Sequence, residues 1–168
     1  MSAARDELIA RLSEAERRLG EHVAAEDHGL PGGLTKPDPG GTERWEAGQV
    51  WAHLAEFPTY WWEQLQRIMA GTDAREPVPF GRVRTDAGRL AAIERDRHSD
   101  PAALLRRVQA GVATVVDGLR SLPDEAWTRV GRHPTLGDVT IGFAVERFIV
   151  GHLEEHVAQL DELRHAQA

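Results

Sequence analysis

The chain has 168 residues, with 20 Lys and Arg against 27 Asp and Glu, so its formal net charge is −7. This acidic balance argues against nucleic acid or an anionic membrane as a partner, because both require a basic face. The absence of cysteine excludes disulfides, cysteine-ligated zinc and a thiol nucleophile. A hydrophobic content of 41% suffices for the core of one domain over residues 1–168. No apolar run approaches the ~18 residues of a membrane span and no signal peptide begins the chain, so we expect a cytoplasmic protein.

Helical periodicity predicts a first helix from about Ala4 to Ala25. Residues 28–42 are dense in glycine and proline and predict a long loop, a kind of segment that is often functional. The second helix is expected from Thr42, as N-cap, to Ala70. Pro58 lies inside it and predicts a kink or a local opening.

The second half of the chain contains two further long helices. Residues 71–84 are irregular, and a short helix is expected over 85–97. A third long helix begins at a Ser99 or Asp100 cap followed by proline and ends near Leu122. Residues 124–138 are typical of turns, and the last helix covers about 140–166. Four long helices predict an all-α four-helix bundle with long connections and no sheet of more than two short strands.

The last helix carries two histidines on its core face. His152 and His156 are four residues apart, so they lie one turn apart and can reach the same metal ion. The zinc-protease motif is absent, because Leu153 stands where that motif has glutamate. A pair with this spacing arises by chance roughly 0.4 times in such a chain. The alternative is therefore two core histidines hydrogen-bonded to neighbours. The stripe that contains the pair is Val145, Ile149, His152, His156, Leu160 and Leu163.

A third histidine is expected to face the core from the second helix. His53 lies beside the apolar stripe of Val50, Leu54 and Phe57. Three imidazoles with an open fourth position are typical of catalytic metal sites. Without cysteine, such a donor set suits Zn, Ni, Fe or Co. Here too the alternative is a buried core histidine.

Two stretches of the sequence are similar to the DinB/YfiT-like superfamily of metal-binding four-helix bundles. One is residues 45–57, Trp-Glu-Ala-Gly-Gln-Val-Trp-Ala-His-Leu-Ala-Glu-Phe. The other is residues 148–160, Phe-Ile-Val-Gly-His-Leu-Glu-Glu-His-Val-Ala-Gln-Leu. The resemblance implies that His53, His152 and His156 are the ligands of one metal ion, often zinc or nickel, open to a pocket at one end of the bundle.

The resemblance also implies a class of chemistry. Characterised members of the superfamily include transferases and isomerases that use mycothiol, bacillithiol or glutathione. A metal-bound thiolate would attack an electrophilic small-molecule substrate. The first hypothesis is therefore a thiol-dependent S-transferase or isomerase. The second is a bundle that binds a metal or small ligand without turnover. A bundle without metal, or an enzyme of another class such as a hydrolase, remains a third.

Other polar candidates are less specific. His22 faces inward near the end of the first helix, either towards the site or simply against the helix dipole. Glu154 and Glu155 lie beside the histidine stripe, and one of them is a candidate to hold a ligating imidazole. Arg147 is a candidate to bind an anionic thiol or a carboxylate, with a surface arginine as the alternative. The remaining histidines to be expected on the surface are His98, His133 and His165.

The second helix is unusually rich in large apolar side chains. Trp61 is expected in the core, whereas Trp51 and Trp62 are candidates for a pocket or a dimer face. A bundle of this size is not expected to bury all of these side chains together with Phe57. The sequence therefore predicts a homodimer, in agreement with the family resemblance.

Overall fold

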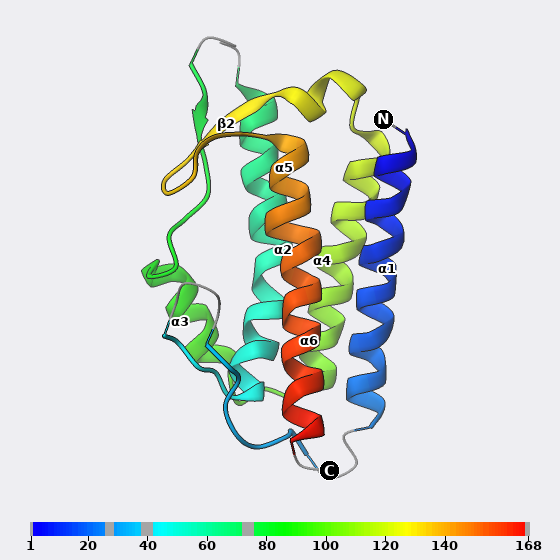
Figure 1. Ribbon diagram of the computed structural model, residues 1–168, viewed down its shortest axis with the longest axis vertical. Helices are drawn as coiled ribbons and strands as arrows, with labels where there is room; N and C mark the ends of the chain where they lie inside the picture. The colour runs from blue at the N-terminus through cyan, green and yellow to red at the C-terminus, as the bar shows by residue number, and fades with distance from the viewer. Residues whose placement is uncertain (1, 26–28, 38–41, 72–75, 167–168) are drawn as a thin grey trace.

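The computed structural model describes residues 2–25, 29–37, 42–71 and 76–166. Its main body is a bundle of four long helical segments. The N-terminus and the C-terminus lie at opposite ends of the bundle (Figure 1). Helix α1 covers Ser2–Ala24, α2 Ala47–Ala70 and α4 Pro101–Ser121. The fourth segment is continuous through α5 (Ile141–Val145), η2 (Glu146–Val150) and α6 (Gly151–His165). The all-α four-helix bundle predicted from the sequence is confirmed.

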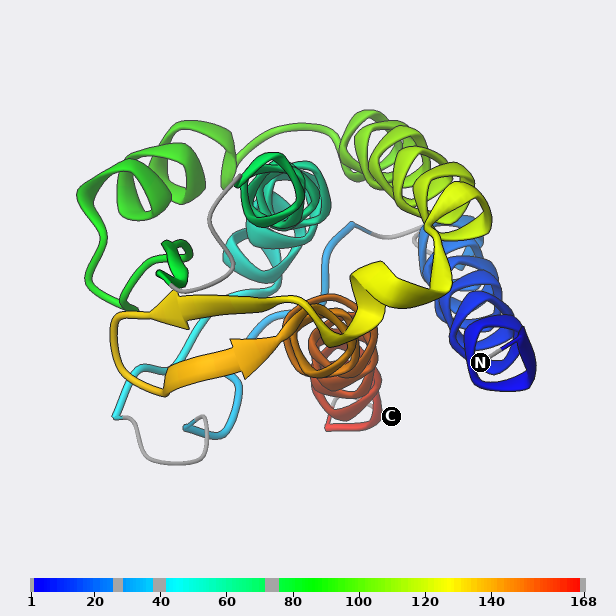
Figure 2. The ribbon, with the colours of Figure 1, turned by 90° about the horizontal axis from the view of Figure 1, so that it is seen from above.

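The helices pack in the ring order α1–α4–α2–α6, seen from above in Figure 2. Consecutive helices α1 and α2 are therefore diagonal rather than adjacent, which explains why a long connection joins them. The core is formed by the stripes that the periodicity indicates. Its largest fully buried side chains include Trp51, Phe57, Leu119 and Ile149. No helix in the described part of the chain is long and apolar enough to cross a membrane.

The start of the second helix was predicted wrongly. It begins at Ala47 and not after Thr42, because Glu46 provides the cap and Gln49 accepts a hydrogen bond from the Glu46 N–H at 3.0 Å. Residues 42–45 lie outside the helix, and Trp45 pairs with Thr35 in the loop before them. The Thr35 N–H donates to the Trp45 carbonyl at 2.8 Å, and the Trp45 N–H donates to Thr35 Oγ1 at 2.9 Å. The helix continues through Pro58.

The segment between α2 and α4 contains β1 (Val78–Pro79) and α3 (Ala87–Asp96), which agrees with the short helix expected there. Asp100, of the two caps considered, accepts hydrogen bonds from the first N–H groups of α4. Residues 26–28, 38–41 and 72–75, which belong to the predicted loops, lie outside the described residues.

The turn-rich segment after α4 forms more regular structure than expected. It contains η1 (Asp124–Thr128) and a hairpin of β2 (Val130–His133) and β3 (Gly137–Thr140). Strand β1 adds to β2 in parallel, so the small sheet has three strands and not at most two. The two-residue β1 was too short to leave a period-two signal in the sequence.

The dimer argument fails on its physical premise. Trp51 and Phe57 are fully buried, and Trp61 and Trp62 are 7% and 6% exposed, so one chain covers all four aromatic side chains. Trp62 packs against α4 at Gly118, where a Cβ atom would lie 1.8 Å from its ring. Trp51 is thus a core residue and not part of a dimer face. The homodimer remains a prediction that rests on the family resemblance.

The last helix contains a π-helical segment just before its histidines. In η2 the hydrogen bond from the Gly151 N–H reaches the Glu146 carbonyl, five residues back. A Cβ atom at Gly151 would lie 3.0 Å from that same oxygen, so glycine suits this position. Such π turns frequently occur beside functional sites. Here the turn immediately precedes His152.

Candidate metal centre

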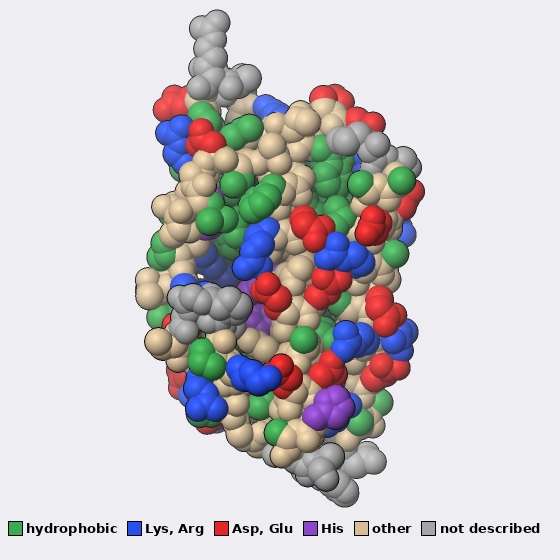
Figure 3. Space-filling view, viewed as in Figure 1, with side chains coloured by type: hydrophobic (Ala, Val, Ile, Leu, Met, Phe, Trp, Pro, Cys, Tyr) green, Lys and Arg blue, Asp and Glu red, His purple; other side chains and the backbone are tan. Residues whose placement is uncertain are grey.

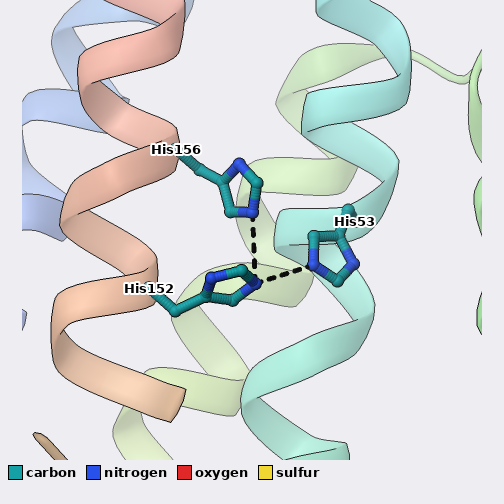
Figure 4. Close-up of side chains that lie close together, drawn as sticks. All are labelled: His53, His152 and His156. Carbon is teal, nitrogen blue, oxygen red and sulfur yellow. Dashed lines mark hydrogen bonds between the residues drawn. The ribbon is translucent and has the colours of Figure 1, made fainter. Parts of the chain in front are cut away.

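The structure brings together the three histidines singled out by the sequence. His53 projects from α2, and His152 and His156 project from α6, with the three rings pointing towards one another (Figure 4). Nε2 of His152 lies 2.9 Å from Nε2 of His53 and 3.2 Å from Nε2 of His156. The possible ligand atoms all lie within 4.8 Å of one another. His53 and His156 are buried, whereas the His152 side chain is 25% exposed.

Each imidazole is held from behind by the residue three positions further along its own helix. Nδ1 of His53 lies 2.8 Å from Glu56, and Nδ1 of His156 lies 2.7 Å from the Gln159 side-chain oxygen. Nδ1 of His152 makes a longer contact of 3.4 Å with Glu155. Partners of this kind fix the orientation and tautomer of metal-binding histidines.

These partners determine which nitrogens carry hydrogens. The Glu56 carboxylate and the Gln159 carbonyl oxygen accept hydrogen bonds, so Nδ1 of both His53 and His156 donates. In a neutral imidazole Nε2 is then a bare lone pair. His152 Nε2 lies beside both lone pairs, but a single hydrogen on it can serve only one of them. A divalent cation would bind the Nε2 lone pairs of all three histidines, so the donor set fits a divalent metal ion.

Electrostatics keep the two buried rings neutral. Burial, followed by the nearby His152, lowers the pKa of His156 to about 3. The pKa of His53 also lies well below its ordinary value, first because of burial and then because of the other two histidines. Burial raises the pKa of Glu56, and its buried ion pair with Arg82 opposes that shift. Neutral imidazole is the form that binds metal.

Aromatic rings enclose the cluster. Trp45 stacks on His156, with ring centroids 5.7 Å apart, and meets His53 edge-on at 5.2 Å. Phe57 lies edge-on to His152 at 4.9 Å. On the open side, a cavity of about 120 Å³ reaches His53 and His152 from solvent. Aromatic rings therefore shield part of the centre, and the cavity reaches it at His53 and His152.

The other predicted candidates have different surroundings. His22 is buried and bonds Asp161 at 2.9 Å, outside the three-histidine cluster. Glu154 pairs with Arg11 at 2.6 Å instead of with a histidine. Glu155 is the acidic neighbour of His152. The hydrogen bond from His152, together with the charge of Arg147, lowers the pKa of Glu155 to about 2.

The predictions for Arg147 and His133 have different outcomes. Arg147 is half exposed and bonds Glu155 at 3.0 Å, so its role as an anion-binding residue stays a prediction. His133 was expected on the surface and is 5% exposed, which corrects that expectation. It is buried because its ring stacks on Phe148 at 4.8 Å and lies near Trp61. His98 and His165 are exposed, as predicted.

The sequence-based reasoning missed Glu56, Gln159 and Trp45 as parts of the site. The first two carried a usable signal, since each lies three residues after an inward histidine and therefore on the same helix face. Trp45 carried none, because it precedes α2 and reaches the site only through its pairing with Thr35.

The fold and the cluster together define a four-helix bundle with a three-histidine centre suited to a metal ion. A family model described as the DinB superfamily matches residues 29–160. The chain belongs to the DinB superfamily. A comparison with curated proteins found no match.

Two solved structures resemble the whole bundle. YfiT from Bacillus subtilis, described as a probable metal-dependent hydrolase with an unusual four-helix bundle topology, gives a TM-score of 0.77 at 22% identity. That match covers 97% of this chain and 87% of that one. A mutant of the mycothiol-dependent maleylpyruvate isomerase gives a TM-score of 0.66 at 14% identity. That match covers 93% of this chain and 60% of that one. At these identities the likenesses establish the fold.

Proposed function

We propose that this protein is a metal-dependent enzyme that uses a low-molecular-weight thiol, as an S-transferase or an isomerase. The observation that supports this most directly is the set of three Nε2 atoms facing one point, with Nδ1 held from behind. The resemblance to a mycothiol-dependent isomerase supports the thiol. When bound, a divalent metal such as zinc or nickel leaves a coordination position at which a thiol or water becomes acidic.

The residues around that position have different roles. His53, His152 and His156 would hold the metal, and the three partners on the same helices keep the lone pairs aimed inward. Trp45 and Phe57 pack against the imidazoles and shield the faces that they cover from water. The partly exposed edge of His152 faces the entry of the small-molecule substrate.

A hydrolase is the second candidate. YfiT, the structural match with a TM-score of 0.77, is described as a probable metal-dependent hydrolase, and the same open position can hold water. A bundle that binds metal or a small ligand without turnover is the non-catalytic alternative. The three possibilities share one metal site and differ in the reaction, so they require separate assays.

The test begins with metal analysis of the purified protein and of His152→Ala. We expect one zinc or nickel per chain, lost in His152→Ala with most helical content retained. His98→Ala, an exposed histidine away from the cluster, is the matched control. Turnover is then measured with mycothiol, bacillithiol or glutathione and a general electrophile such as 1-chloro-2,4-dinitrobenzene, and with an activated ester as hydrolase substrate. Metal retained by a His53, His152 and His156 triple alanine variant would show that the site is wrong.

A further inference from the structure

The cavity beside the histidine cluster has an unusual lining. Besides His53 and His152 it is formed by Trp61, Val83 and three arginines, Arg82, Arg84 and Arg89. Of the described residues, none that lines it is acidic. Figure 3 shows basic side chains and a histidine meeting in a hollow on this face of the molecule. The protein as a whole is acidic, so this local positive charge stands against the balance of the chain.

Two of the arginines are held firmly in place. The Arg82 side chain is 9% exposed, pairs with Glu56 and lies over the Tyr60 ring at 3.9 Å. Arg89 is 7% exposed, donates to the Arg84 carbonyl at 2.8 Å and lies over Trp45 at 4.8 Å. Their positions are thus fixed by packing before any ligand arrives, which lowers the entropic cost of binding.

Two acidic groups near the cavity already have partners within the protein. Glu56 receives the Nδ1 hydrogen of His53 and the charge of Arg82, and Asp86 caps α3 by accepting from the Arg89 N–H at 2.9 Å. Arg84 is exposed at the mouth of the cavity. Arg82 is thus neutralised by Glu56, whereas the described residues that line the cavity itself include three arginines and no acidic side chain.

We propose that this cavity binds the carboxylate of a small anionic substrate next to the metal centre. The inference rests on the proposed function in that it names the substrate class of the same site. Arginine is the side chain best suited to a carboxylate, because its planar fork donates two parallel hydrogen bonds. The volume of about 120 Å³ is well below the ~300–1,000 Å³ of sites for drug-sized ligands. It therefore fits a carboxylate with one or two carbons, and Trp61 and Val83 offer those carbons an apolar wall.

The first experiment uses the metal-free full-length protein, so that it does not depend on turnover. Propionate and the neutral isostere propionamide are titrated by ligand-observed NMR at low chloride concentration. We expect propionate to bind at least tenfold more tightly than propionamide. Arg84→Gln should weaken propionate binding about threefold or more, since this arginine is exposed, and Arg82→Gln about tenfold.

Arg84→Gln keeps the test valid if Arg82→Gln fails to fold, because Arg84 lies on the surface. Arg106→Gln, an exposed arginine on α4 outside the cavity, is the matched control and should bind propionate as the wild type does. Equal binding of propionate and propionamide would overturn the proposal. The proposal would also be overturned if Arg147→Gln lost propionate binding while Arg84→Gln retained it, because the anion site would then lie at Arg147.

A second arm identifies which reactant carries the carboxylate. The cobalt-loaded protein is titrated with 3-mercaptopropionate and with neutral 2-mercaptoethanol, following the cobalt absorption spectrum. A tenfold preference for 3-mercaptopropionate that Arg84→Gln abolishes assigns the carboxylate to the thiol. Equal affinity of the two thiols, with propionate still bound, assigns it to the electrophile. Propionate binding without thiol turnover would reject the proposed function alone, and turnover without propionate binding would reject this inference alone.

Discussion

Gln159 offers the sharpest test of how the centre is held. Its side-chain oxygen accepts the Nδ1 hydrogen of His156 at 2.7 Å, and His156 is 1% exposed. In Gln159→Leu this hydrogen is either buried without a partner or moved to Nε2, where it points at the metal position. An unsatisfied buried donor costs about 1–3 kcal/mol. Loss of such a supporting partner typically lowers metal affinity about 10–100-fold. Because a tenfold change in affinity corresponds to about 1.4 kcal/mol, this loss of metal affinity agrees with the cost of the unsatisfied donor.

The opposite substitution provides the control. Gln159→Glu replaces the amide by a carboxylate that accepts the same hydrogen more strongly, so zinc affinity should equal or exceed that of the wild type. Affinities are measured by competition with a chromophoric chelator at pH 7.5, with helical content checked by circular dichroism. The reasoning would be refuted if Gln159→Leu bound zinc within twofold of the wild-type affinity while His156→Ala did not bind zinc in the same assay.

Three further outcomes follow from the structure. The pKa of His156 is about 3 and that of His53 is also lowered, so between about pH 6.5 and 3 the unfolded chain binds more protons than the folded one. The metal-free protein should therefore lose stability as the pH falls through this window, by up to about 1.4 kcal/mol per pH unit for each histidine. Urea unfolding at pH 7 and 5 measures this, and His156→Leu should reduce the slope. Gly118→Ala places a Cβ 1.8 Å from the Trp62 ring and should lower the free energy of unfolding by about 1–3 kcal/mol. Gly20→Ala meets no atom within 4 Å and should raise it by up to about 1 kcal/mol, so equal effects of the two substitutions would contradict the packing.

Helical periodicity was sufficient to predict the bundle, because each long helix buries one stripe. It also placed His152 and His156 inward, since Ile149 and Leu160 on the same face required it. The position of His53 relative to that pair was a different matter. It depends on how α2 is packed against α6, and no local pattern in the sequence encodes that register. The family resemblance supplied the pairing, and the structure supplied the distances.

The expectations that proved wrong concern contacts between distant segments. Thr42 is a residue type that often caps helices, but Thr35 pairs with Trp45, and α2 begins only at Ala47 with Glu46 as its cap. His133 lies in a turn-like sequence, yet aromatic side chains from α2 and η2 cover its ring. In both cases local propensity was overridden by tertiary contacts.

The arrangement of the centre follows from one property of the α-helix. Residues three and four positions apart share a face, so a single helix can present both a ligand and the group that holds it. On α6 the spacing of four places His156 one turn after His152, and the spacing of three places Gln159 behind His156. On α2 the same spacing joins His53 to Glu56. Two helices therefore suffice to build the cluster, which leaves the segment between α2 and α4 free to shape the entrance. That segment carries Arg82, and the substrate preference of this bundle should accordingly depend on it more than on the helices that hold the histidines.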